Sequence, residues 1–314
     1  MVRLILIVLM ALGAGLVSAQ GYPAKPMRIV TAPPGGGNDL AARMIAIGLA
    51  GAFGQQVTVD NRPSGVIVVD AVTKAPPDGY TLLLYSDGLW LLPLLQKVPY
   101  DPVRDLSSIT MVGNSPSVLA VHPALPAKSV KELIVLAKAR PGELNYAISA
   151  VGGNSHLQAE LFKSMTGIKM VGVNYKGGGL LVTALMSGEV QLSFATGPSI
   201  APHVKSGRIK ALAVTSAQPS VLFPGMPTVA ASGLPGFEAG TLYSAFAPAK
   251  TAAAIIAQLN REIASVLNVT ETRSKLLDGG IEAVTSTPEQ LAAKMSSEMM
   301  RMGKVVRDAG IRID

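Results

Sequence analysis

Three glycine-rich segments carry the residue types that could bind an anion through the main chain. They are Pro34-Gly35-Gly36-Gly37-Asn38-Asp39, Gly152-Gly153-Asn154-Ser155 and Gly177-Gly178-Gly179. Glycine lets the backbone approach a ligand closely, and a helix that begins behind such a segment offers unpaired N–H groups and about half a positive charge. Each segment therefore predicts an anion site built from backbone donors.

Such donors supply enough free energy to hold a small carboxylate. Micromolar binding needs about −8 kcal/mol, and one hydrogen bond to a charged group contributes roughly 1.5–3 kcal/mol. Several N–H and hydroxyl groups that converge on one carboxylate can therefore bind it without an arginine, and water can complete its shell. The segments predict an anion-binding cleft and leave the identity of the anion open.

Catalytic interpretations of the same residues have less support. The chain has no cysteine, and His122, His156 and His203 lack the spacing of metal ligands. No Walker A loop, dinucleotide fingerprint or G-x-S-x-G elbow occurs. A secreted hydrolase that uses Ser149 or Ser155 with a histidine stays an alternative, but Ser155 is expected to cap a helix whose first turn contains His156. We therefore predict no enzyme activity, no metal and no cofactor.

The composition is that of a globular protein with a large core. Hydrophobic residues make up 49% of the 314 residues, which predicts one large or two modest domains. The formal net charge is +7, but the basic residues are scattered and aromatic residues reach only 4%. This pattern gives no support for nucleic-acid binding and is compatible with an anionic ligand.

The first 19 residues have the features of a secretory signal peptide. Arg3 precedes an apolar run from Leu4 to Val17, which is short for a membrane span, and Val17-Ser18-Ala19 resembles a cleavage site. We predict cleavage after Ala19, export to the periplasm and a soluble mature chain that begins near Gln20.

Strand-like and helix-like segments alternate in two sets. In the first set, the expected elements are 27–32, 40–49, 56–60, 66–74 and 80–85. In the second set, the expected strands are 117–122, 145–149, 170–173, 190–194 and 210–214. Such alternation predicts mainly parallel sheets flanked by helices. The glycine-rich segments then follow strands, at the edge where open α/β sheets bind ligands.

Three helix starts have the sequence of a capping box. They begin at Ser129, Ser155 and Thr287, and the last opens an amphipathic C-terminal helix that ends at Gly310. Together with the two α/β sets, this predicts two lobes with the cleft between them. The expected boundaries are a signal peptide at 1–19, a first lobe at 20–120 and 243–314, and a second lobe at 121–242.

Many short motifs, in order, resemble those of a known family from about Tyr22 to Asp314. The motifs include Pro33-Pro34-Gly35-Gly36, Asn61-Arg62-Pro63, Pro77-Asp78-Gly79-Tyr80, Pro99-Tyr100-Asp101-Pro102, Ser155-His156-Leu157, Tyr175-Lys176-Gly177 and Pro227-Thr228-Val229. The chain resembles the substrate-binding receptors of tripartite tricarboxylate transporters, called Bug receptors.

The resemblance implies a two-lobed periplasmic-binding-protein fold that closes on a small organic acid and delivers it to membrane transporter subunits. It further implies that the first glycine-rich loop faces Ser149 to His156 across the cleft, and that Ser86 and Thr196 lie at the ends of two further strands. With these residues, the predicted ligand-binding set is Pro34, Gly35, Gly36, Gly37, Asn38, Asp39, Ser86, Ser149, Gly152, Gly153, Asn154, Ser155, His156, Gly177, Gly178 and Thr196. The expected protein is a monomer.

The sequence departs from the family pattern at positions that concern the ligand. The loop Ser64-Gly65-Val66-Ile67 is about two residues shorter than usual, and alanine replaces the acidic residues expected at Ala184 and Ala195. Losing two acidic groups predicts a preference away from ligands that carry an amino group.

Overall fold

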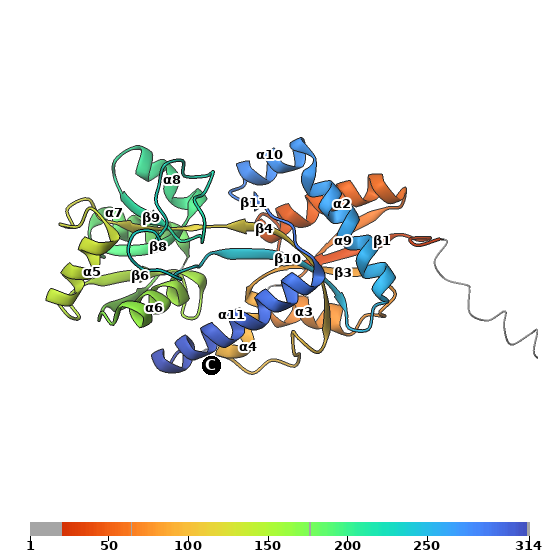
Figure 1. Ribbon diagram of the computed structural model, residues 1–314, viewed down its shortest axis with the longest axis horizontal. Helices are drawn as coiled ribbons and strands as arrows, with labels where there is room; N and C mark the ends of the chain where they lie inside the picture. The colour runs from red at the N-terminus through yellow and green to blue at the C-terminus, as the bar shows by residue number, and fades with distance from the viewer. Residues whose placement is uncertain (1–20, 64, 176, 313–314) are drawn as a thin grey trace, which may run out of the picture.

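Two β-sheets with helices on both faces form two lobes joined through extended strands (Figure 1). The computed structural model describes residues 21–63, 65–175 and 177–312, so the predicted signal peptide lies outside the described residues. Within the described part, no helix is both long enough and apolar enough to cross a membrane. The fold class predicted from the sequence is confirmed.

The first lobe contains both ends of the described chain. Its elements are β1 (Met27–Thr31), α2 (Gly37–Phe53), β2 (Val57–Asn61), α3 (Val66–Thr73), β3 (Thr81–Ser86), α4 (Gly88–Leu95), β4 (Leu106–Ser115), β10 (Thr241–Pro248), α9 (Ala253–Asn268), α10 (Thr270–Asp278), β11 (Glu282–Ala283) and α11 (Pro288–Ala309). The strand order is β11-β4-β10-β3-β1-β2, with β1 parallel to β2 and β3. Strand β10 lies antiparallel between β3 and β4.

The second lobe is a five-stranded sheet formed by the middle of the chain. Its elements are β5 (Ser117–Val121), α5 (Val130–Ala139), β6 (Asn145–Ile148), α6 (Asn154–Thr166), β7 (Val171–Asn174), α7 (Gly178–Ser187), β8 (Leu192–Thr196), α8 (Gly197–Lys205) and β9 (Lys210–Val214). The strand order is β7-β6-β8-β5-β9, with β6 parallel to β7 and β8 and with β5 antiparallel to its two neighbours.

The chain passes between the lobes where β4 continues into β5 and where β10 begins; we call these two crossings the hinge. Strand β5 pairs in the second sheet, although residues 117–120 were expected in the first lobe. We therefore propose boundaries at Pro116 and Gly240 in place of 120 and 242. The hinge strands β4 and β10 were not predicted as strands, because serine, alanine and glycine interrupt their apolar pattern.

The apolar core is continuous between the lobes on only one side of the hinge. One cluster contains Trp90 and Phe246 of the first lobe, Phe162 and Phe194 of the second, and Met302 of α11. Helix α11 contacts both α4 and α6, and Figure 1 shows it extending from the first lobe toward the second. On the opposite side, the cluster beneath α2 and α9 and the cluster beneath α7 and α8 are separate.

The three predicted capping boxes have different outcomes. At Thr287 both reciprocal hydrogen bonds with Gln290 form, so this prediction is confirmed. Ser129 caps α5, because its hydroxyl accepts from the Glu132 N–H at 3.2 Å. The reciprocal bond of a capping box does not form, since the Glu132 carboxylate accepts from the main-chain N–H of Lys128 and not from that of Ser129. The prediction of a capping box at Ser155 is wrong, because α6 begins at Asn154 with Gly153 as its N-cap.

Candidate functional site

In the described residues, six helices follow the parallel strands of the two sheets, and none of these helix starts is capped by a side chain. Glycine is the N-cap of α2, α3, α6 and α7, at Gly36, Gly65, Gly153 and Gly177. Asp87 precedes α4 and Thr196 precedes α8, also without a side-chain cap. Helices α9 and α10 lack such caps too, but α9 follows β10, which runs antiparallel to β3, so α9 begins at the opposite edge of the sheet, and α10 follows α9. Their free N–H groups are available to an anion.

Helix starts from both lobes converge on the first three residues of β10. The side-chain amide of Asn154, at the start of α6, donates to Thr241 Oγ1 at 2.7 Å. The Asp87 N–H, at the start of α4, donates to the carbonyl of the next residue, Leu242, at 2.9 Å. A Cβ placed on Gly37, at the start of α2, would overlap with Tyr243 Oη, so this helix start lies directly against the tyrosine ring.

The start of α8 lies at the other hinge crossing. Thr196 pairs with Ser117 of β5, and a Cβ on Gly197 would lie 3.4 Å from the Pro116 carbonyl. The chain therefore brings four helix N-termini, two from each lobe, to the hinge. Their partial positive charges add at one place, as an anion site requires.

The loop before α2 is held by the buried carboxylate of Asp39. Asp39 Oδ2 accepts from the Gly35 N–H at 3.0 Å and from Arg43 at 3.1 Å, while Oδ1 accepts from Asn61 at 2.8 Å. Burial raises the pKa of Asp39, but the hydrogen bonds from Arg43, Asn61 and Gly35 outweigh it and lower the pKa below its usual value. Both carboxylate oxygens are thus occupied by protein donors, which indicates that Asp39 orders the loop rather than contacting a ligand.

The loop before α6 is held in a similar way by the helix that follows it. The Ser155 hydroxyl accepts from the Ser149 N–H at 2.9 Å and lies 3.2 Å from the Ser149 hydroxyl. His156 Nδ1 accepts from the Gly152 N–H at 3.0 Å. Ser155 is therefore a buried residue that orders the loop, and not the N-cap that its sequence suggested. Among the described residues, no hydrogen bond joins Ser149 or Ser155 to a histidine, as a hydrolase would require.

The acceptor role of His156 depends on its neutral form. Burial is the main cause that lowers its pKa; Lys163 adds to this, while Glu160, with Oε1 3.8 Å from Nε2, acts in the opposite direction. Because the unfolded chain binds the proton more readily, the contribution of His156 to stability is present above about pH 6.5 and is lost as the pH falls below that value.

We expect NMR titration to give His156 a pKa below the model-peptide value of about 6.5. The melting temperature should fall as the pH drops below about 6.5, and this fall should be shallower in His156→Gln, which keeps a neutral acceptor. His203→Gln, which replaces a histidine in α8 outside this loop, is the control and should retain the wild-type pH profile. A His156 pKa at or above 6.5 would contradict the assigned tautomer.

The remaining predicted residues lie along the same set of helix starts. Pro34, Gly35 and Gly36 are exposed, and the buried Oδ1 of Asn38 has no hydrogen-bond partner within the described part of the chain. Ser86 ends β3 opposite Tyr243, Gly177 has a φ of 101°, which favours glycine, and Gly178 begins α7. The Thr196 hydroxyl donates to Ser199 Oγ. Ligand contact by these residues stays a prediction.

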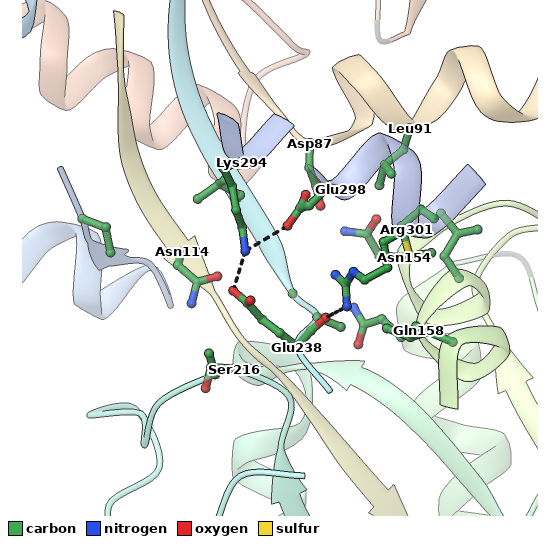
Figure 2. A pocket seen from close by; sticks show the side chains of 18 of the residues that line it. Asp87, Leu91, Asn114, Asn154, Gln158, Ser216, Glu238, Lys294, Glu298 and Arg301 are labelled. Carbon is green, nitrogen blue, oxygen red and sulfur yellow. Dashed lines mark hydrogen bonds and ion pairs between the residues drawn. The ribbon is translucent and has the colours of Figure 1, made fainter. Parts of the chain in front are cut away.

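A cavity of about 410 Å³, partly open to solvent, lies beside the hinge and is lined by both lobes and by α11 (Figure 2). We call it the hinge cavity. Of the predicted residues, only Asn154 lines it. Its other polar residues were missed, because charges spaced along α11 look like an ordinary solvated face in the sequence. The polar residues that line it are Asp87, Asn114, Asn154, Gln158, Ser216, Gln218, Glu238, Glu282, Lys294, Glu298 and Arg301.

Comparison with known proteins assigns the chain to a family. The model of the tripartite tricarboxylate transporter family receptor matches residues 41–311. Protein BugT of Bordetella pertussis is 39% identical over 96% of this chain and 94% of its own length. Among solved structures, R. palustris Rpa4515 with adipate has a TM-score of 0.74 at 34% identity, and MatC from Rhodopseudomonas palustris with bound malate has 0.71 at 26%.

These two structures match almost the whole fold. The alignments cover 93% and 91% of this chain and 99% and 100% of the matched chains, respectively. The family resemblance inferred from the sequence is therefore confirmed by an independent family match and by the fold. The chain belongs to the family of tripartite tricarboxylate transporter receptors, which are periplasmic solute-binding proteins.

Proposed function

We propose that this receptor binds a small di- or tricarboxylate between its lobes and presents it to the membrane subunits of a tripartite transporter. The observation that carries the proposal is the convergence of uncapped helix starts on Thr241, Leu242 and Tyr243. Those starts supply N–H donors from both lobes, so a bound carboxylate would favour the closed arrangement of the lobes. The adipate and malate of the two related structures belong to the same chemical class.

The remaining parts of the proposal concern where and how the protein acts. We propose cleavage after Ala19, a periplasmic mature chain and a monomer that binds without turnover. The second candidate for the membrane partner is a sensor protein, to which the receptor would present its bound ligand. The hydrogen bonds that occupy Ser155 and His156 favour binding over hydrolysis.

The ligand preference follows from two small residues in the second lobe. Ala184 of α7 and Ala195 of β8 are buried apolar residues, at positions where the family resemblance implies acidic groups. A cleft without these carboxylates offers fewer partners to an ammonium group. We therefore propose that succinate or citrate binds more tightly than aspartate.

The test is a thermal-shift panel of organic acids on the mature chain, followed by calorimetry of each acid that raises the melting temperature. At a ligand concentration about 100 times the Kd, stabilisation by about 2.7 kcal/mol is expected. Tighter binding of aspartate than of succinate and citrate would contradict the proposed preference, and the absence of any stabilising acid would contradict the proposed ligand class. Loss of a substrate on long incubation, abolished by Ser155→Ala, would favour the hydrolase.

A further inference from the structure

The hinge cavity contains a buried carboxyl group that the proposed carboxylate site does not use. Asp87 is only 5% exposed, lines the cavity and has no hydrogen-bond partner at Oδ1 among the residues that the structure describes. Figure 2 shows its side chain beside that of Glu298. A buried polar atom without a partner is costly, so Oδ1 marks a position where a hydrogen-bond donor is missing.

The basic groups of the cavity are already engaged elsewhere. Lys294 lies 2.8 Å from a carboxylate oxygen of Glu238 and 3.3 Å from one of Glu298, and Arg301 donates to the Glu238 carbonyl at 2.8 Å. Glu298 also accepts from Trp90 Nε1 at 3.1 Å. Asp87 receives none of these donors, and the carboxylates that line the cavity outnumber the basic groups. When Asp87 is ionised, the net negative charge of these lining side chains exceeds the partial positive charge at the start of α4, so this cavity favours a cation.

The rest of the wall is apolar and comes from both lobes. Leu91 of α4 and Met302 of α11 belong to the first lobe, while Leu157 and Leu161 of α6 belong to the second. An occupant that pairs with Asp87 therefore needs an apolar body as well as a positively charged donor. The volume of about 410 Å³ lies within the range of small-ligand pockets.

We propose that the hinge cavity is a second binding site, which takes a small organic cation: a primary amine with a short apolar body whose ammonium group donates to Asp87 Oδ1. This site goes beyond the proposed carboxylate cleft and does not depend on it. Because its wall comes from both lobes and α11, an amine bound there bridges the lobes on the side opposite α2 and α7.

The protonation state of Asp87 gives the site a distinctive pH dependence. Burial and the neighbouring Glu298 raise the pKa of Asp87 well above its usual value. The other charged or titratable groups that face this region are Glu298, Lys294 and Arg301 of α11, Glu238, Glu282 of β11 and Tyr243 of β10. An ammonium group binds the ionised carboxylate and expels its proton, so affinity should rise with pH until Asp87 is ionised in the empty cavity.

The experiment is calorimetric titration with n-butylamine, and with n-butanol as its uncharged counterpart, at pH 6, 7 and 8 in an amine-free buffer. The wild-type protein should bind butylamine, with an affinity that rises by up to about tenfold per pH unit, and should bind butanol at least about tenfold more weakly. Asp87→Asn keeps the shape of the side chain and should lose at least about tenfold in butylamine affinity together with the pH dependence.

Asp308→Asn is the matched control, because it removes the same charge from an exposed position on α11 outside the cavity. It should bind butylamine as the wild type does. Equal binding of butanol, unchanged binding by Asp87→Asn, or no binding of butylamine would each overturn the proposal. A parallel titration with succinate measures binding at the carboxylate cleft. The amine proposal and the carboxylate proposal can therefore fail independently of each other.

Discussion

Replacing Gly36 with aspartate should abolish carboxylate binding and leave the protein at least as stable as the wild type. Gly36 is the N-cap of α2, with φ −98° and ψ 175°, an extended conformation that aspartate adopts readily at N-caps. A Cβ at this position meets no heavy atom within 4 Å. The new carboxylate would accept from the free N–H groups of α2 and place a negative charge where we propose that the ligand binds.

The expected loss of affinity is at least about 100-fold, since two charge-assisted hydrogen bonds of roughly 1.5–3 kcal/mol each would be replaced by repulsion. Stability should rise by no more than a few tenths of a kcal/mol, because glycine is itself an acceptable N-cap. Calorimetry with the acid identified in the panel, together with urea denaturation, measures both effects.

Ala252→Asp is the matched control for this substitution. Ala252 is the exposed N-cap of α9, which also has no side-chain cap, and because β10 runs antiparallel to β3 it lies at the edge of the first sheet opposite to the start of α4. Aspartate there should stabilise the protein by about 0.5–2 kcal/mol and leave ligand affinity unchanged. Wild-type affinity in Gly36→Asp would show that the start of α2 does not contact the ligand.

Replacing Trp90 with alanine should cost about 3–5 kcal/mol of the free energy of unfolding, as is usual for a buried aromatic residue. Trp90 is fully buried and packs edge-on against Phe246, with ring centroids 6.3 Å apart. Its Nε1 also donates to Glu298 of α11. The alanine variant therefore loses a large apolar contact and leaves a carboxylate of the hinge cavity without one of its donors.

Trp90→Phe separates the two contributions. Phenylalanine keeps most of the apolar contact and removes only the hydrogen bond, so it should cost about 1–3 kcal/mol. Since Trp90 is the only tryptophan in the chain, unfolding must be followed by circular dichroism rather than by tryptophan fluorescence. Equal free energies of unfolding for the alanine variant and the wild type would contradict the role assigned to this side chain.

The sequence predicted those parts of the fold that depend on local patterns. The apolar runs of β1, β3 and β5 and the glycines before α2, α6 and α7 are visible within a few residues, so both lobes and their helix starts were anticipated. Ser155 shows the limit of such reasoning. The S-x-x-Q pattern predicts an N-cap, but the amide of Ser149, six residues earlier, takes the hydroxyl as its acceptor.

The hinge cavity could not be predicted, because its wall is assembled from distant parts of the chain. Asp87 and Glu298 are neighbours only because α11 returns across α4, and Trp90 reaches Glu298 over a separation of 208 residues. Neither residue carries a local signal, since an aspartate after a strand and a glutamate on a charged helix are both ordinary. Long-range packing alone gives them a shared environment.

The continuous apolar core beneath α11 restricts how ligand can enter and leave this receptor. Rotation that parted the lobes on that side would expose Phe162, Phe194 and Met302 to water, whereas the separate clusters beneath α2 and α7 share no such contact. The lower-energy rotation therefore leaves α11 in place and widens the opposite mouth. Solute exchange is then one-sided, and the face of the molecule that carries α11 keeps the same shape in the loaded and empty receptor.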